Sequence, residues 1–385
     1  MNRRKLIIGG ASLSVLGIGG FIAWRAKANK DKIGFEPNAE FIEKAKKLIN
    51  QNPMIDTHAH PGRFFVKDSK NTSLPFWIRT LLRNTFEEKA IADIQETKMS
   101  AVAFAGVADI DILGMKKSGS LYNARNFAQG EAWESYGRQI KHIKEVLTKN
   151  KINIALNPDD IRAAIKNHAL SAILTFEGAD FLEGKIERIK EIYDNGIRSV
   201  TIVHYTASEI GDIQTQTPIR GGLTEFGIAA VKEMQNQGII IDLAHAAEPT
   251  AFKALENVSV PVICSHTHIN GGASGEFPRF ISNELAQAIV KGGGIIGAWP
   301  TGVKISTISG FVDRIFELSQ KVGTDAISIG TDMGANYKPV VTKYVDLILV
   351  VSELLRRGMN EADVVKFMGG NFLRVFDKIQ AARKV

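Results

Sequence analysis

The segment MIDTHAHPG at 54–62 carries two histidines one residue apart, His58 and His60. In an extended strand, side chains at i and i+2 point to the same face, so both imidazole rings would converge on one point. Asp56 shares that face. Neutral imidazoles are good ligands for zinc and similar divalent cations, so the pair is a candidate metal site. A pair of surface histidines in a loop is the alternative, and the rest of the chain favours the metal.

Other side chains that could bind a metal or move a proton also follow apolar runs. They are Glu177, His204, His245, His266 and Asp332. With His268, two residues beyond His266, six of the eight histidines lie at such places. Burying that many imidazoles without ligands would cost free energy, so packing alone does not explain them. Only His142 and His168 lie elsewhere, and we expect both to be solvated.

Eight short runs rich in apolar and β-branched residues are the elements that must position these groups. They span 54–60, 101–107, 172–178, 199–205, 239–245, 261–267, 295–300 and 327–333. Nearly continuous hydrophobicity is typical of parallel strands buried on both faces. Amphipathic helical stretches lie between most of them, for example 186–196 and 226–238, the second of which Gly238 closes as a C-cap.

Eight strand–helix units in this length predict an α/β fold of the (β/α)8 TIM-barrel type. A doubly wound open sheet is the alternative, but it would not place candidate ligands at the ends of so many strands. In a barrel, the C-terminal ends of the strands surround one mouth, where the active site is built. We therefore expect the metal site at that mouth.

The first 28 residues differ in composition from the rest of the 385-residue chain. They hold five basic residues and no acids, and without them the formal charge falls from +7 to +2. The basic character therefore comes largely from this leader, and nucleic acid is not an expected partner. The chain has one cysteine, Cys264, within an apolar run, so there is no disulfide framework. We expect Cys264 to be buried by packing.

The leader resembles an export signal. Arg3 and Arg4 precede an uncharged stretch at 6–24, and Ala26-Lys27-Ala28 follows. The paired arginines are similar to the twin-arginine type, although Asn2 replaces the serine usual before the pair. We expect residues 1–28 to be an export signal or membrane anchor and 29–385 to be one metallohydrolase domain. The protein would be periplasmic or anchored to the outer face of the cytoplasmic membrane. A tether through 6–24 and a homodimer both stay open.

Taken in order, these motifs resemble the membrane (renal) dipeptidase family of dinuclear zinc peptidases over roughly residues 50–380. The motifs are DTHAH at 56–60, FEG at 176–178, IVHY around His204, GLTEFG at 222–227, IDLAH at 241–245, SHTH at 265–268 and GTD at 330–332. ELLRRG at 353–358 and GGNFLRVF at 369–376 match too. These last two have no evident catalytic content, so their agreement argues for common descent.

The resemblance implies a role for each site residue. His58 and His60 would bind the first of two divalent cations, expected to be Zn²⁺, and His245 and His266 the second, with Glu177 bridging both. The implied catalytic and substrate-binding residues are His204, which would stabilise the oxyanion, Arg279, which would bind a substrate carboxylate, and Asp332, which would handle the proton.

Two positions depart from the family pattern. The family usually has His-x-Asp where this chain has His58 and His60, which removes one negative charge from a site for two dications. The family also usually has a second acid after the strand-eight motif, where this chain has Gly334 and Ala335. His-x-His also occurs in the wider amidohydrolase superfamily, which often bridges its metals with a carboxylated lysine on strand four. Residues 199–205 contain no lysine, so Glu177 is the natural bridge.

These features predict a hydrolase that cleaves dipeptides or related small amides with a metal-bridged hydroxide. A lactonase, phosphoesterase or deaminase on the same scaffold is the first alternative, because the fold alone does not choose the electrophile. A non-catalytic binding protein of the envelope is the second. Asp56 could hold a histidine ring or cap the following turn, and we favour the first. Asp242 could orient a ligand or cap a helix.

Overall fold

In the computed structural model, eight parallel strands close into a barrel. The structure describes residues 32–71, 87–117, 120–272 and 275–384. In order around the barrel the strands are β1 (Ile55–Ala59), β2 (Ala101–Val107), β6 (Ser171–Glu177), β7 (Ile197–Thr201), β8 (Ile240–Asp242), β9 (Ile263–Thr267), β10 (Ile295–Ala298) and β11 (Ile327–Ile329). The pairing of β11 with β1 and of β2 with β6 closes the ring and excludes an open sheet.

All eight predicted strands are confirmed; β2 and β6 are as long as their apolar runs, and the others are shorter. Three further strands of the described residues lie outside the ring: β5 (Asn153–Ile154) extends the sheet beside β6, and β3 (Leu113–Met115) pairs with β4 (Leu121–Asn123) as a hairpin. Every residue of the eight barrel strands is buried, as expected for strands with side chains filling the barrel on one face and helices covering the other.

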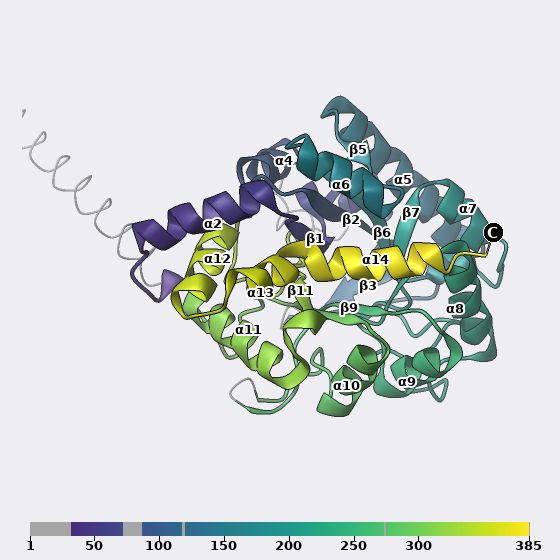
Figure 1. Ribbon diagram of the computed structural model, residues 1–385. Helices are drawn as coiled ribbons and strands as arrows, with labels where there is room; N and C mark the ends of the chain where they lie inside the picture. Colours follow the sequence, from purple (N-terminus) through teal and green to yellow (C-terminus); the bar gives the residue numbers. More distant parts are fainter. Residues whose placement is uncertain (1–31, 72–86, 118–119, 273–274, 385) are drawn as a thin grey trace, which may run out of the picture.

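Helices surround the strands (Figure 1). They are α2 (Ala39–Gln51), α4 (Glu87–Glu96), α5 (Glu131–Lys149), α6 (Pro158–Lys166), α7 (Arg188–Asp194), α8 (Glu225–Gln237), α9 (Glu248–Asn257), α10 (Asn283–Lys291), α11 (Ile308–Val322), α12 (Asp346–Arg356), α13 (Glu361–Val365) and α14 (Asn371–Ala381). The GLTEFG motif begins α8, because the Thr224 hydroxyl accepts a hydrogen bond from the Gly227 amide. Gly238 ends the same helix with φ of 78°, which confirms the predicted C-cap.

One end of the barrel is closed by apolar side chains. Isoleucines at the start of several strands, among them Ile55, Ile173 and Ile263, pack with Phe372 and Phe376 of α14. In Figure 1, α14 crosses in front of the strands at this end. The opposite end, where the strands finish, is therefore the only mouth that the described residues leave for a site.

The leader at 1–28 lies outside the described residues, so the predicted signal or anchor has no structural account. Among the described residues, no helix combines the length and apolar character needed to cross a membrane. Cys264 is buried within β9, as predicted.

Candidate metal centre

The predicted site residues meet at the C-terminal mouth of the barrel. They are at most 7% exposed: His58, His60, Glu177, His204, His245, His266, Arg279 and Asp332. Glu177 is the last residue of β6, and His266 lies within β9. His60 directly follows β1, whereas Asp332 stands three residues beyond β11. Most of these side chains line a cavity of about 380 Å³.

Glu177 is the centre of the arrangement. Its Oε1 lies 2.7 Å from Nε2 of His245, 3.4 Å from that of His58 and 3.5 Å from that of His266. Its Oε2 lies 3.2 Å from Nε2 of His204 and 3.3 Å from that of His60. Glu177 thus contacts all four histidines that were predicted to bind metal, with His58, His245 and His266 on one oxygen and His60 on the other.

Two imidazoles have their tautomer set by the nitrogen that faces away from Glu177. Nδ1 of His60 lies 2.8 Å from the Ala105 carbonyl oxygen, which can only accept, so Nδ1 carries the proton. Nδ1 of His266 lies 2.9 Å from the Ser265 hydroxyl, which itself donates to Asp242. In both residues, Nε2 therefore presents a lone pair to the cavity, as a metal ligand must.

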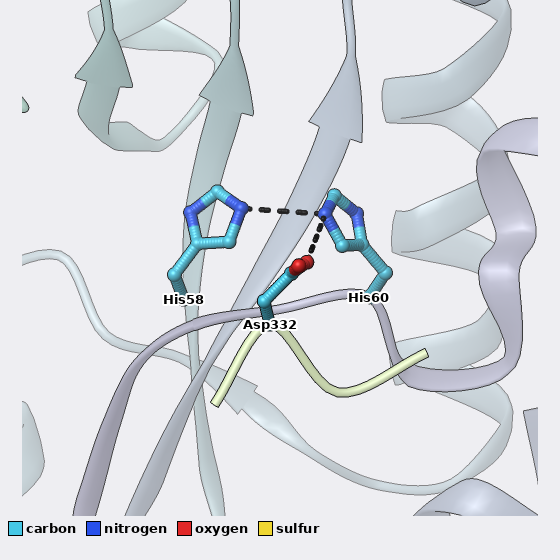
Figure 2. A group of neighbouring side chains, drawn as sticks. All are labelled: His58, His60 and Asp332. Atoms are coloured by element: carbon cyan, nitrogen blue, oxygen red, sulfur yellow. Dashed lines mark hydrogen bonds and ion pairs between the residues drawn. The ribbon is translucent and has the colours of Figure 1, made fainter. Parts of the chain in front are cut away.

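The candidate ligands form two groups that share no residue, and a third that overlaps both. His58, His60 and Asp332 make one, with the two Nε2 atoms 3.3 Å apart and Asp332 Oδ1 3.5 Å from Nε2 of His60 (Figure 2). Glu177, His245 and His266 make another, with Nε2 of the two histidines 3.1 Å apart. The third group, His58, Asp242 and His266, takes one histidine from each of the others, so the division of the histidines between two cations stays a prediction.

The charges of the centre are strongly interdependent. Burial by itself would raise the pKa of Glu177, but the surrounding His204, His58 and His245 hold that pKa well below its usual range. Burial lowers the pKa of His58, yet the charges of Glu177, Asp242 and Asp332 together outweigh burial and raise that pKa to about 9. Burial and the Arg279 charge depress the pKa of His266. The carboxylate of Glu177 thus supplies the negative charge that faces the surrounding imidazoles.

This donor set fits divalent cations. Imidazole Nε2 atoms close enough to share one ligand sphere, with a carboxylate between them, are the ligands that zinc prefers. Nδ1 of His58 and Nδ1 of His245 are buried without a hydrogen-bond partner in the described part of the chain. In both rings Nε2 is the nitrogen that contacts Glu177, so Nε2, and not the unsatisfied Nδ1, is the candidate ligand atom.

Two loop residues of the mouth adopt left-handed backbone conformations that are rare outside glycine. His245 has φ of 67° and Asp332 has φ of 53°. Such strain costs about 1 kcal/mol or more per residue and persists where the surrounding structure enforces it. Gly334 has φ of 97°, and a Cβ there would lie 2.3 Å from the His60 carbonyl oxygen. The glycine that departs from the family pattern thus packs directly on the backbone of a candidate ligand.

Arg279 lies beside the second group of ligands. Its Nη2 is 2.9 Å from Nε2 of His266, its Nη1 donates to the Gln214 side chain, and its guanidinium lies 5.5 Å from the centroid of the Trp299 ring. The side chain is 3% exposed and lines the cavity. The sequence pattern gave no reason to expect Gln214 or Trp299, since neither belongs to a recurring spacing.

The sequence reasoning also missed Asp109. Its Oδ1 lies 2.6 Å from Nδ1 of His204, and it is fully buried. Strand 101–107 was one of two predicted strands, with 295–300, to which no polar group had been assigned, and an acid two residues beyond its end was the available signal.

The contacts of Asp56 and Asp242 decide between the alternative roles predicted for them. The prediction that Asp56 holds a histidine ring is wrong: it accepts from the backbone amides of His58 and Thr331 and from the Tyr344 hydroxyl. It therefore joins β1 to the end of β11. Asp242 accepts from the amide and hydroxyl of Ser265, the partner of His266, so it orients that ligand indirectly.

The remaining histidines lie outside the centre. The prediction that His142 is solvated is wrong, because α5 buries it and its Nε2 lies 2.5 Å from Glu87 Oε1. An amphipathic helix can bury a polar residue when another helix provides a hydrogen-bond acceptor, here Glu87 of α4. His168 is exposed, as predicted. His268 pairs with Glu317 at 3.3 Å and belongs to neither group of ligands.

Comparisons with known proteins agree with this arrangement. A family model described as membrane dipeptidase (peptidase family M19) matches residues 42–385. The dipeptidase verJ of Clonostachys rogersoniana is 23% identical over 365 residues, which cover 88% of this chain and 87% of that protein. The dipeptidase tcpJ of Claviceps purpurea is 26% identical over 246 residues, covering 61% of this chain and 57% of that protein.

Solved structures share the fold. The probable dipeptidase PvdM from Pseudomonas aeruginosa has a TM-score of 0.71 at 17% identity and covers 90% of this chain and all of its own. A metallo peptidase from Rhodobacter sphaeroides, solved with a phosphinate mimic of the dipeptide L-Ala-D-Ala, has a TM-score of 0.69 at 15% identity. It covers 85% of this chain and 99% of its own.

Proposed function

The chain belongs to the membrane dipeptidase family, and from this premise we propose that it cleaves dipeptides or related small amides with two bound divalent cations. It is a dipeptidase-like hydrolase. The observation that carries the proposal is the convergence of four histidines on the two oxygens of Glu177, beside a cavity of about 380 Å³. That volume suits a substrate of a few residues.

We propose Zn²⁺ for both cations, since imidazole and carboxylate donors suit it. His58 and His60 would hold one, His245 and His266 the other, and Glu177 would lie between them. When bound, the pair supplies a water of lowered pKa and a Lewis acid for the carbonyl oxygen, as a metal-bridged hydroxide requires.

Asp332 is the proposed proton carrier. It lines the cavity with Oδ1 3.5 Å from Nε2 of His60. Burial and the neighbouring Glu177 charge raise its pKa to about 8, which suits a carboxyl that exchanges a proton near neutral pH. It takes the proton from the attacking water and returns it to the leaving amine. His204 faces the cavity with Nε2 and donates to the oxygen that becomes negative during attack.

Arg279 is the proposed anchor for the substrate carboxylate. A guanidinium binds a carboxylate through two parallel hydrogen bonds, a geometry that lysine cannot reproduce. Its Nη2 now donates to Nε2 of His266, whose lone pair cannot serve a cation and Arg279 together. Loading the site would therefore release Nη2 for the substrate.

Two further positively charged side chains, those of Arg63 and Lys116, line the same cavity. Arg63 has φ of 55°, so a left-handed turn directs it from the end of β1 toward the site. Its guanidinium lies 5.5 Å from the centroid of the Phe65 ring, and that ring is in edge contact with His60. We propose that these charges favour substrates with a second anionic group, such as dipeptides with an acidic residue.

The test is to purify the protein, measure its metal content, and assay dipeptides with L- and D-residues at the second position beside N-acyl amino acids, lactones and phosphoesters. We expect two metal equivalents and fastest hydrolysis of dipeptides. Arg279→Lys should raise KM for dipeptides while leaving esters that lack a carboxylate unaffected. Preference for lactones or phosphoesters, or full activity after metal removal, would reject the proposal.

We also propose that the protein is exported and acts in the periplasm or at the outer face of the cytoplasmic membrane. The support is the leader alone, with Arg3, Arg4 and the apolar stretch at 6–24. A fusion of residues 1–35 to a reporter that must fold before transport should be exported, and Arg3→Lys with Arg4→Lys should block it. Unchanged export of the double variant would contradict the twin-arginine route.

A further inference from the structure

His204 has a carboxylate partner on the side away from the cavity. Nδ1 of His204 lies 2.6 Å from Oδ1 of Asp109. The other oxygen, Oδ2, accepts from the Tyr205 amide at 3.0 Å and from the Thr206 hydroxyl at 3.1 Å. Asp109 is fully buried and His204 is 5% exposed. Both oxygens of Asp109 are thus used by one short segment, 204–206.

This partner differs from those of the other imidazoles in the centre. His60 gives Nδ1 to a carbonyl and His266 to a hydroxyl, both of which are neutral acceptors. A carboxylate binds the ring more strongly, because a charge-assisted hydrogen bond is roughly twice as strong as a neutral one. It also offsets the positive charge that the ring bears whenever both of its nitrogens donate.

The His204 ring has few other contacts. It follows the end of β7 by three residues, on a segment without helix or strand. Nε2 lies 3.2 Å from Oε2 of Glu177, and the ring makes edge contacts with Tyr205 and His245, both with centroids 4.6 Å apart. Glu177 is itself a candidate metal ligand, so in a metal-loaded site the bond to Asp109 would be the main restraint on rotation of the ring.

We infer that Asp109 is a positioning residue for hydrolysis: its carboxylate fixes His204 with Nδ1 toward Asp109 and Nε2 toward the substrate carbonyl. The inference rests on the proposed function, because it assigns His204 to the oxygen that becomes negative during attack. Asp109 touches neither the substrate cavity nor a candidate metal ligand. Its effect would therefore appear in the chemical step and not in metal binding.

A second buried carboxyl nearby provides a matched control. Asp180 lies on the short turn after β6, is 6% exposed, and its Oδ2 has no hydrogen-bond partner among the described residues. Burial and the charge of Asp109 raise the pKa of Asp180 well above its usual range, which favours the neutral carboxyl. Asp180→Asn repeats the change of carboxyl to carboxamide without touching His204.

The kinetic test compares Asp109→Asn with Asp180→Asn in the metal-loaded enzyme. Asp109→Asn should lower kcat by about 10- to 100-fold with KM and metal content unchanged, and should weaken a phosphinate dipeptide mimic by the same factor as kcat/KM. Asp180→Asn should stay within about twofold of the wild type. In a His204→Gln background, Asp109→Asn should cause little further loss, since residues that act as a unit are not additive.

A spectroscopic readout does not depend on turnover. In the metal-free protein, the Nδ1 proton of His204 should give a downfield-shifted resonance that is absent from Asp109→Asn and His204→Gln but present in Asp180→Asn. Its presence in Asp109→Asn, an additive loss with His204→Gln, or a fall in metal content would overturn the inference. Should the wild type hydrolyse no dipeptide, the proposed function fails, and the resonance still decides whether the pair exists.

Discussion

The two ends of this barrel differ in the polarity of their side chains. At the closed end, isoleucines at the starts of the strands pack under Phe372 and Phe376 of α14. At the mouth, the same strands end in imidazoles and carboxylates that are almost as well buried. Apolar burial stabilises the fold by about 25 cal/mol per Å², whereas buried ionisable groups cost free energy unless they are paired or bind a metal.

The difference teaches where stability and function reside in this chain. Apolar contacts at the closed end hold eight strands together, which lets the mouth tolerate strain such as the left-handed backbone of His245 and Asp332. Changes at the mouth should therefore affect chemistry and metal binding more than folding, and changes at the closed end should do the reverse. Four substitutions, from the largest expected effect to the smallest, test this division.

Glu177→Gln should cause the largest effect. Gln lacks the charge needed to bridge two cations, and metal-ion catalysis contributes several kcal/mol, so kcat/KM should fall by more than about a thousandfold. Metal content by mass spectrometry should fall as well, while circular dichroism stays that of a folded barrel. Glu191→Gln, an exposed change on α7, is the control and should leave all three unchanged. A metal-replete, active Glu177→Gln variant would rule out the bridging role.

Phe376→Ala tests the closed end. Phe376 is fully buried and its ring lies 5.9 Å from that of Phe372. Removing it should lower the free energy of unfolding by about 3–5 kcal/mol, measured by urea denaturation. Kcat per folded molecule should stay within about twofold, because the mouth is built from other residues. Lys378→Ala, an exposed change on the same helix, should shift stability by less than about 0.5 kcal/mol.

Sequence reasoning succeeded where a periodic or recurring signal exists. Buried parallel strands are continuous apolar runs, so all eight could be located, and ligands at their ends follow from the barrel geometry. Asp109 was not identified from the sequence because a single acidic residue after a strand resembles any acidic residue in a loop. His142 was misjudged because its partner, Glu87, is 55 residues away, and no local pattern indicates a long-range hydrogen bond. Asp56 was misassigned because its partners, Thr331 and Tyr344, approach only when β11 closes against β1.

His60→Asp tests whether the net charge of the metal centre at the mouth determines substrate preference. His60 contributes a neutral ring, so the centre is more positive by one charge than with the family's usual Asp, and substrates that bring an anionic group near the metals should benefit. The variant should change the ratio of kcat/KM for acidic over neutral dipeptides by about tenfold, or 1.4 kcal/mol. His60→Asn, which removes the ring without adding charge, is the control. Proportional loss on every substrate would mean that position 60 is only an alternative ligand.

Tyr344→Phe tests whether the two ends are independent. The Tyr344 hydroxyl donates to Asp56 Oδ2 at 2.9 Å, and Asp56 also accepts from Thr331 and from the backbone amide of His58. Loss of this one bond should lower the free energy of unfolding by about 1 kcal/mol. Since Asp56 touches the backbone of His58 and not its ring, kcat should change by less than about threefold.

The stability loss in Tyr344→Phe should also depend on pH. Burial raises the pKa of Asp56, whereas hydrogen bonds from Thr331 and Tyr344 lower it. Without the tyrosine hydroxyl, the folded-state pKa of Asp56 rises further, because the lost hydrogen bond stabilises the ionised carboxylate more than the protonated carboxyl. Stability of the variant relative to wild type should therefore fall as pH increases from about 4 toward neutrality, measured by urea denaturation at each pH. A pH-independent loss would mean that the Tyr344 bond does not favour the ionised form of Asp56. A tenfold fall in kcat with the barrel intact would mean that Asp56 transmits strain to the metal ligands and that the two ends are coupled.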